Sequence, residues 1–229
     1  MAGHLRPQKF LVWQTEQVTR LVLASTSPAR LALLRAGGIE PTTISPGVDE
    51  DAVAERATSI GLINSTADMV HLLAKAKAEA VIDHPDARGA LIIGCDSSLE
   101  FDGEALGKPH EPEVAKARWL SMRGRAGTLY SGHWLIDNRE LQPGVAAPAA
   151  GRVSSSIVHF ADLTDREVDA YVATSEPLKV AGAFTIDGLG GAFLRSIEGD
   201  AHTVIGLSLP TLRELVRGLG VEYTSLWNR

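Results

Sequence analysis

Residues 21–38 read LVLASTSPARLALLRAGG, and this stretch indicates an α/β fold. The apolar run LVLA is typical of a short buried strand. Ser27 and Pro28 are typical of a helix start, and LALLRAGG of a helix that ends at Gly37. Because a buried strand leads directly into a capped helix, the segment has the pattern from which α/β proteins are built.

The same alternation continues along the chain, while Asp102-Gly103 predicts a two-residue hairpin turn. Residues 41–51 read as a turn-rich acidic connection, and residues 181–200 as tight turns between short strands. We expect an α/β fold class, a mixed sheet flanked by helices. The predicted strands are 21–25, 90–101, 128–137 and 153–163, and the predicted helices are 28–36, 66–82, 111–124, 165–173 and 210–220.

The bulk properties exclude several classes of protein. The chain has 229 residues and a net charge of -6, which argues against a general nucleic-acid binder. Cys95 is the only cysteine, so neither an intrachain disulfide nor a cysteine-based zinc site is expected. No apolar run approaches the ~20 residues that cross a bilayer, and FLVW is too short for a signal peptide. We expect a cytoplasmic protein without a membrane partner, with a flexible extension at 1–19 and one domain at 20–229.

Arg30 is out of place for a helix start. If Ser27 is the N-cap, Arg30 stands three residues later, where a capping box has Glu or Gln. A cation in this turn is unfavourable by ~0.3–1 kcal/mol because of the helix dipole. Two interpretations remain open: the side chain reaches solvent or an acidic neighbour, or an anion such as phosphate binds here to Ser25, Ser27 and Arg30.

Lys77 and Asp96 are also placed unusually. Lys77 lies on a helix stripe that is otherwise apolar, so it either extends to the edge of the core or reaches into a site. Asp96 follows the apolar run LIIG and is either a turn residue or a group that holds Mg²⁺ or orients water. Cys95 beside it is expected to be a small buried side chain without a lowered pKa.

Lys108 lies in GEALGKP, which does not match a Walker A motif because the glycines are too close and Pro109 replaces Ser or Thr. Between Gly107 and Pro109, Lys108 is still a candidate phosphate clamp. His133 falls on a predicted strand, and we interpret it as a structural residue.

Five blocks of the sequence together resemble the Maf family of nucleoside triphosphate pyrophosphatases, from about residue 20 to the C-terminus. They are LASTSPAR-x-x-LL, PGVDE, AKAKA, IIGCDSSLEFDGEALGKP, and a C-terminal block with AGAFTIDGLGG and VIGLSLPTL. Their order and spacing make the resemblance more specific than any single motif. It implies an ITPase-like fold with two lobes around a central cleft, and a homodimer.

The resemblance implies hydrolysis of a nucleoside triphosphate to the monophosphate and pyrophosphate with a divalent metal, Mg²⁺ or Mn²⁺. Such an activity would serve as house-cleaning of non-canonical or modified nucleotides. Asp96 matches the family's catalytic aspartate and Glu50 its second carboxylate, both as metal ligands. The positions that match its substrate-binding residues are Ser25, Ser27, Arg30, Lys77 and Lys108.

Three positions that resemble the family's specificity determinants depart from its dTTP- and UTP-preferring members. Those members carry arginine, threonine and glutamine where this chain has Ala29, Ser97 and Asp187. A group of relatives that act on 7-methyl-GTP has an acidic residue at the last position, as here. The resemblance therefore implies a nucleotide substrate whose base is left open.

Two other kinds of function are alternatives to the enzyme. The family's historical association suggests a nucleotide-binding regulator of septum formation that turns nothing over. A purely structural module fits poorly with charged residues placed beside apolar elements at four separate points of the sequence. The full set of acidic and basic positions favours the enzyme.

Overall fold

The computed structural model describes residues 18–140 and 145–228. Most of the extension expected at 1–19 lies outside the described residues, so its flexibility stays a prediction. None of the described helices is both long and apolar enough to span a bilayer.

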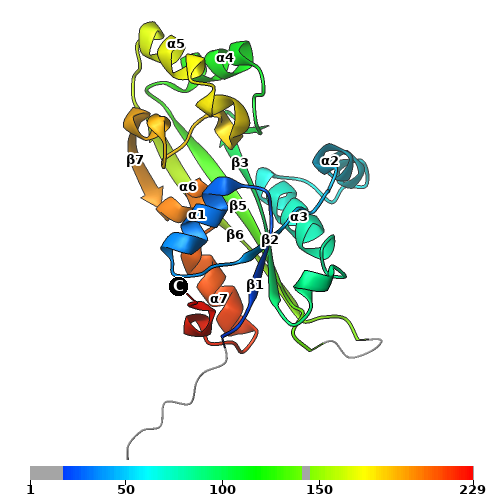
Figure 1. Ribbon diagram of the computed structural model, residues 1–229. Helices are drawn as coiled ribbons and strands as arrows, with labels where there is room; N and C mark the ends of the chain where they lie inside the picture. The colour runs from blue at the N-terminus through cyan, green and yellow to red at the C-terminus, as the bar shows by residue number, and fades with distance from the viewer. Residues whose placement is uncertain (1–17, 141–144, 229) are drawn as a thin grey trace, which may run out of the picture.

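A mixed sheet forms the centre of the molecule (Figure 1) and confirms the predicted α/β class. Its strands follow the order β2-β1-β3-β5-β6-β7, and the short β4 pairs with β3. The pairings of β1 with β2 and with β3 are parallel, and the other pairings are antiparallel. The strands are β1 (Leu21–Ala24), β2 (Thr42–Ile44), β3 (Leu91–Phe101), β4 (Glu104–Leu106), β5 (Ala126–Asp137), β6 (Ala149–Phe160) and β7 (Leu194–Gly199).

Helices cover both faces of the sheet near β1. Alternate side chains of this strand point to opposite faces, and all four are buried, so each face has apolar residues that a helix covers. Leu21 and Leu23 pack in one core with α1 and α7, whereas Val22 and Ala24 pack in another with the end of α3. The helices are α1 (Pro28–Ala36), α2 (Glu50–Ser59), α3 (Thr66–Glu79), α4 (Pro112–Met122), α5 (Asp165–Ala173), α6 (Ala201–Ile205) and α7 (Leu209–Gly218).

A further core lies at the other end of the long strands, where Figure 1 shows α4 and α5 together. Trp119 of α4 is fully buried there, and its Nε1–H donates to the Ala183 carbonyl at 2.8 Å. Its ring meets Phe160 and Tyr171 edge to face. β3 and β5 contribute residues to this core and to both of the others, and β6 contributes to this core and to the one with α1 and α7, so the long strands connect two separately packed ends.

Local sequence signals account for most element boundaries. Ser27 caps α1 and Pro28 begins it, as predicted, and Gly38 with φ 83 follows its end. The capping box of Thr164 and Glu167 at the start of α5 is present. Asp102 and Gly103 adopt the positive φ values that the predicted hairpin requires.

Two stretches were predicted wrongly in detail. The connection at 41–51 contains β2 and the first residues of α2, which Asp49 caps by accepting from the Ala52 N–H. The stretch 181–200 holds a single strand, β7, preceded by short 3₁₀ turns. β2 has three residues, and α2, although ten residues long, buries only Ala57, so neither shows a clear hydrophobic periodicity in the sequence.

Two glycines allow α3 to lie directly against the sheet. A Cβ on Gly94 would meet the Ala74 carbonyl oxygen at 2.2 Å, and one on Gly132 would meet the Val70 carbonyl oxygen at 2.1 Å. Any side chain at either position would push the helix outward. This close approach brings Lys77, on the sheet-facing side of α3, beside β3.

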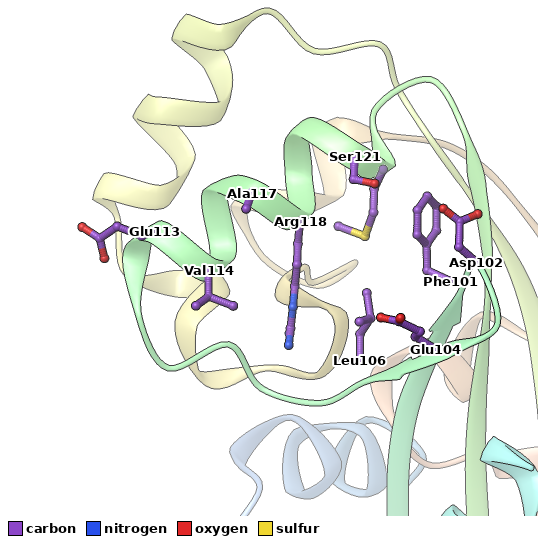
Figure 2. Close-up of a pocket in the computed structure, with 10 residues that line it drawn as sticks. Phe101, Asp102, Glu104, Leu106, Glu113, Val114, Ala117, Arg118 and Ser121 are labelled. Atoms are coloured by element: carbon purple, nitrogen blue, oxygen red, sulfur yellow. The ribbon is translucent and has the colours of Figure 1, made fainter.

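A pocket of about 590 Å³ lies between α4 and the β3–β4 hairpin (Figure 2). Leu106, Val114 and Met122 contribute apolar surface to it, and Glu104 and Glu113 lie at its edge. Its lining includes none of the predicted site residues.

Candidate functional site

The candidate site lies where the neighbours of β3 change along one of its edges. On this edge β3 pairs with β1 up to Gly94 and with β4 from Leu99, so Cys95–Ser98 has no strand partner there within the described part of the chain. β1 ends at Ala24, beside Gly94, and its chain turns into α1. Such points, at the carboxyl ends of parallel strands, are where open α/β sheets bind ligands.

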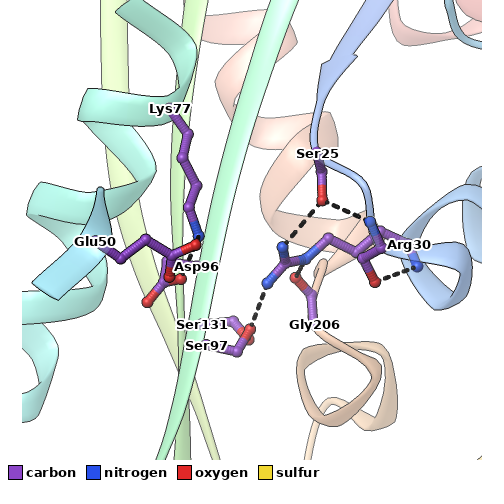
Figure 3. Close-up of polar contacts among 9 residues, drawn as sticks. Ser25, Arg30, Glu50, Lys77, Asp96, Ser97, Ser131 and Gly206 are labelled. Atoms are coloured by element: carbon purple, nitrogen blue, oxygen red, sulfur yellow. Dashed lines mark hydrogen bonds and ion pairs between the residues drawn. The ribbon is translucent and has the colours of Figure 1, made fainter. Parts of the chain in front are cut away.

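On one side of this edge, a lysine joins two carboxylates (Figure 3). Lys77 Nζ lies 2.6 Å from Asp96 Oδ1 and 2.9 Å from Glu50 Oε1. The Lys77 and Asp96 side chains are only 7% and 10% exposed, whereas that of Glu50 is 43% exposed. The cluster therefore opens to solvent on the Glu50 side, because Glu50 begins α2 and its side chain reaches in from there.

Asp96 is the buried carboxylate of this cluster. Burial raises the pKa of Asp96 above its usual value, although the Lys77 and Arg30 cations oppose the rise. Its carboxylate is thus deprived of water and depends on neighbouring cations for compensation. A carboxylate in this state binds a further cation or a proton more readily than an exposed one.

On the other side of the edge, Arg30 is held by neutral oxygen atoms (Figure 3). Its Nε donates to the Gly206 carbonyl at 2.8 Å. Nη1 donates to Ser25 Oγ at 3.3 Å, and Nη2 donates to Ser97 Oγ at 3.1 Å. The three acceptors come from Gly206 at the C-terminal cap of α6, from the β1–α1 connection and from β3, so segments distant in sequence fix one guanidinium.

No carboxylate of the described residues forms an ion pair with Arg30, although Arg30 is only 9% exposed. A buried cation without an anionic partner is costly. The sequence left two interpretations of Arg30 open. The one in which its side chain reaches solvent or an acidic neighbour is therefore wrong. The geometry agrees with the other, in which an anion binds at this helix start.

The alternating direction of the β3 side chains explains why the groups around Lys77 and Arg30 lie on opposite sides of the strand. Successive side chains on a strand point to opposite faces, so Asp96 faces α3 and Ser97 faces the α1 side. Figure 3 shows Lys77 and Arg30 on either side of the strand. A ligand lying across the unpaired edge would meet carboxylates at one end and the guanidinium at the other.

The other predicted site residues make fewer contacts with the two groups around Lys77 and Arg30. Ser27 Oγ accepts from the Arg30 backbone N–H at 3.4 Å and so serves as the helix cap. Ala29 is partly buried beside it. Lys108 and Asp187 are exposed, and neither forms a hydrogen bond or ion pair with another described residue. Their proposed contacts with substrate stay predictions, as do the roles of the remaining candidates.

Sequence reasoning passed over two residues that complete the Arg30 surroundings. Ser131 is fully buried on β5, and its Oγ lies 2.8 Å from Ser97 Oγ. Gly206 supplies the carbonyl that Arg30 Nε contacts. Ser131 belongs to no motif, and Gly206 lies in the block VIGLSLPTL without any sign of this contact. Only the pairing of β3 with β5 and the docking of α6 reveal their roles. His133, interpreted as structural, is fully buried and its Nε2 accepts from the Ser208 N–H at 2.8 Å.

Comparison with known families decides which group of proteins this arrangement represents. The profile described as Maf-like protein matches residues 20–219. The chain belongs to the Maf-like family. The match spans both sides of the site, from β1 to α7, and confirms the resemblance seen in the sequence.

Several bacterial Maf-like relatives carry the name nucleoside triphosphate pyrophosphatase. The one from Leifsonia xyli subsp. xyli is 56% identical over 213 residues, covering 92% of this chain and 97% of the relative. That from Streptomyces avermitilis is 50% identical, covering 91% of this chain and 94% of the relative. The relative from Salinispora tropica is 51% identical, covering 92% of this chain and 88% of the relative.

Among solved structures, the Staphylococcus aureus Ham1 protein matches 88% of this chain and 100% of its own. The identity is 14% and the TM-score 0.42, so we draw no conclusion from this similarity. The ITPase-like subdivision of the fold stays an expectation from the sequence.

Proposed function

We propose that this Maf-like protein hydrolyses a nucleoside triphosphate to the nucleoside monophosphate and pyrophosphate. The observation that carries the proposal is the buried Arg30, which lacks an anionic partner within the described structure and lies across β3 from the Asp96–Lys77–Glu50 cluster. The names of the relatives, at 50–56% identity for those from Streptomyces avermitilis and Leifsonia, support the same activity.

Arg30 has donors left for a phosphate. A guanidinium carries five N–H groups, and three hydrogen bonds to protein oxygens are formed here, one from each nitrogen. One N–H on each terminal nitrogen is therefore left, which suits a phosphate because two such donors bind it in a fork. The start of α1 adds backbone N–H groups and the positive end of the helix dipole.

Asp96 and Glu50 fit a divalent metal such as Mg²⁺ or Mn²⁺. Both carboxylates contact the same Lys77 Nζ, so their oxygens can surround one cation. The described residues contain no group of three or more such ligands. Mg²⁺ commonly takes one or two carboxylates together with substrate phosphates. When bound, the metal would neutralise charge on the triphosphate.

The proposed reaction places water against the α-phosphorus. Asp96 accepts a proton from the water as its oxygen bonds to phosphorus, and the bond from the α-phosphorus to the α–β bridging oxygen breaks. Pyrophosphate leaves with the electrons of that bond. Arg30 and Lys77 offset the charge on the phosphate oxygens, and positioning with charge stabilisation is what phosphoryl transfer chiefly requires.

Finer aspects of the proposal rest on the resemblance to the family. They are the removal of non-canonical or modified nucleotides, a homodimeric assembly, and a cytoplasmic location. Asp187, Ala29 and Ser97 are proposed to set the preferred base, and Lys108 to contact phosphate. No nucleic-acid partner is proposed for a chain of net charge -6.

Pyrophosphate release tests the proposal directly. The wild type is assayed with Mg²⁺ and with Mn²⁺ against canonical and methylated nucleoside triphosphates, and EDTA should abolish release. Asp96→Asn should lower turnover by at least ~100-fold, because it removes the proposed proton acceptor and metal ligand. Asp102→Asn is the matched control, since Asp102 is an exposed carboxylate in the hairpin turn at the end of β3.

Two outcomes would contradict the proposal. Full turnover by a folded Asp96→Asn variant would remove Asp96 from the mechanism. Nucleotides that raise the melting temperature of the wild type, without turnover on any substrate or metal, would instead indicate the regulator.

A further inference from the structure

We infer that Ser131 is a positioning residue for the triphosphate site, acting on Arg30 through the hydroxyl of Ser97. The inference rests on the proposed function, in which Arg30 binds phosphate. It concerns a side chain that belongs to no motif and lies behind the residues that a nucleotide could touch.

The three side chains form a chain of hydrogen bonds (Figure 3). Arg30 Nη2 donates to Ser97 Oγ at 3.1 Å, and Ser97 Oγ lies 2.8 Å from Ser131 Oγ. Ser131 Oγ in turn donates to the Thr203 carbonyl at 2.8 Å. The chain thus runs from the guanidinium to the backbone of α6.

The last link fixes the direction of all the others. A hydroxyl has a single proton, and a carbonyl oxygen can only accept. Because the Ser131 proton is used on Thr203, Ser131 must accept from Ser97. Ser97 therefore donates to Ser131 and presents a lone pair to Arg30, which is the orientation that a cationic donor requires.

Rigid surroundings hold this chain in place. Ser97 and Ser131 are directly opposite each other in the antiparallel pairing of β3 with β5. Ser131 and Thr203 are both fully buried, so water cannot replace either partner without disturbing the core. The orientation of the Ser97 hydroxyl is consequently set by the fold before any nucleotide arrives.

The same helix also holds the opposite side of the guanidinium. The carbonyl of Gly206, the residue that ends α6, accepts from Arg30 Nε at 2.8 Å. Gly206 has φ 114, and a Cβ there would lie 3.2 Å from both Arg30 Nε and Ser97 Oγ. Thr203 and Gly206 thus fix two edges of the guanidinium, one through the serines and one directly.

This arrangement assigns Ser97 an indirect role, so its proposed effect on the preferred base would also act through Arg30. Its proton is already donated to Ser131, so Ser97 does not donate to a nucleotide while the chain is intact. Ser97 instead sets the direction in which Arg30 presents its remaining N–H groups. Without Ser131, the Ser97 hydroxyl would be free to rotate and its lone pair would no longer be held toward Arg30.

Ser131→Ala tests the inference. We expect KM for the preferred nucleoside triphosphate to rise about tenfold, with kcat changed less than about threefold, since an interaction with bound phosphate is weakened rather than a reacting group removed. The increase in melting temperature that saturating pyrophosphate produces in the wild type should shrink in parallel. Ser131→Thr keeps the hydroxyl and should restore most of both quantities.

Ser156→Ala is a closely matched control. Ser156 is a serine on the adjacent strand β6, is 2% exposed, and donates to the Asp200 carbonyl at the start of α6 at 2.9 Å. It forms no hydrogen bond with Arg30 or Ser97 within the described structure. A general loss of stability should appear equally in both variants, whereas the change in KM should appear only in Ser131→Ala.

A double variant separates positioning from damage to the fold. In an Arg30→Lys background the fork of the guanidinium is absent, so adding Ser131→Ala should change KM less than about twofold. Equal KM values for Ser131→Ala and Ser156→Ala would overturn the inference, as would a full tenfold effect of Ser131→Ala in the Arg30→Lys background. Failure of the wild type to release pyrophosphate from any substrate would instead overturn the proposed function.

Discussion

Cys95 and Asp96 are neighbours on β3, yet their surroundings give them opposite chemistry. Cys95 points into the core formed with α1 and α7 and is fully buried, whereas Asp96 points toward Lys77. Burial raises the pKa of the Cys95 thiol to about 11, and the nearby Arg30 and Lys77 cations do not offset this. A shift of one position along a strand thus separates an inert thiol from a carboxylate that faces the proposed ligand.

The Cys95 thiol should be unreactive in the native protein. With a pKa of about 11, only about one thiol in a thousand is ionised at pH 8, and the thiolate is the reactive form. An aromatic disulfide reagent should therefore release no more than a trace of chromophore in buffer, and one equivalent after unfolding in guanidinium chloride. Rapid stoichiometric labelling of the native protein would contradict the buried position of Cys95.

At the scale of elements, Glu176 organises the glycine-rich segment that precedes β7. Its carboxylate accepts from Tyr171 Oη and Thr185 Oγ1 and from the N–H groups of Leu189 and Gly190, at 2.6–3.0 Å. A Cβ on Gly188 would lie 2.7 Å from Glu176 Oε2, so the segment can wrap closely around the carboxylate only with glycine there. Glu176 thus joins the end of α5 to the segment that carries Asp187.

Glu176→Gln should destabilise the protein by about 1–3 kcal/mol at pH 7, because the amide replaces one of the two accepting oxygens with an NH2 donor and leaves part of the four hydrogen bonds unmade. Burial opposes ionisation of Glu176, but the hydrogen bonds outweigh it and lower the pKa to about 2. A carboxylate with a lowered folded-state pKa contributes stability above its unfolded pKa of ~4.3 and loses it as the pH falls toward the folded value.

The free energies of unfolding of the wild type and Glu176→Gln should therefore differ most at pH 5–7 and converge between about pH 4.3 and pH 2. Guanidinium titrations at several pH values measure this. Glu104→Gln, at an exposed carboxylate on β4, should leave the unfolding free energy nearly unchanged. A gap for Glu176→Gln that stays constant down to pH 2 would show that its ionised carboxylate is not what stabilises the segment.

At the scale of the whole molecule, the long strands join two packed ends. β3 contributes Leu91 and Ile93 to the core with α1 and α7, and Leu99 to the core with α4 and α5. The proposed site lies on the part of β3 between these residues. Because each strand is continuous, we expect both ends to unfold together.

Trp119→Ala tests this coupling. Trp119 is fully buried among aromatic rings at the α4–α5 end, so its loss should cost about 3–5 kcal/mol. Urea unfolding followed by far-ultraviolet circular dichroism and by fluorescence of the remaining tryptophans should still show coincident single transitions. Trp227→Ala, at a side chain that is 53% exposed, should have a much smaller effect. Two separate transitions in Trp119→Ala would contradict coupling through the strands.

Much of the fold could be predicted from the sequence because its signals are local. Ser27 and Pro28 start α1, Thr164 and Glu167 start α5, and Asp102-Gly103 turns the β3–β4 hairpin. In each case the cap or turn depends on residues within three positions of one another. The missed strand β2 is short, and the missed helix α2 buries only Ala57, so no apolar stripe supports its cap.

The sequence by itself determined that Arg30 is a misplaced cation on a capped helix, and that Lys77 and Asp96 are charges on apolar elements. Only the tertiary structure decided how these charges are compensated. Two carboxylates pair with Lys77, while the hydrogen bonds of the Arg30 side chain to the described residues go to neutral oxygens, among them that of Gly206, which is 176 positions away. Hydrogen bonds between distant strands and helices depend on sheet register and helix docking, which follow from packing the whole chain and have no local signature.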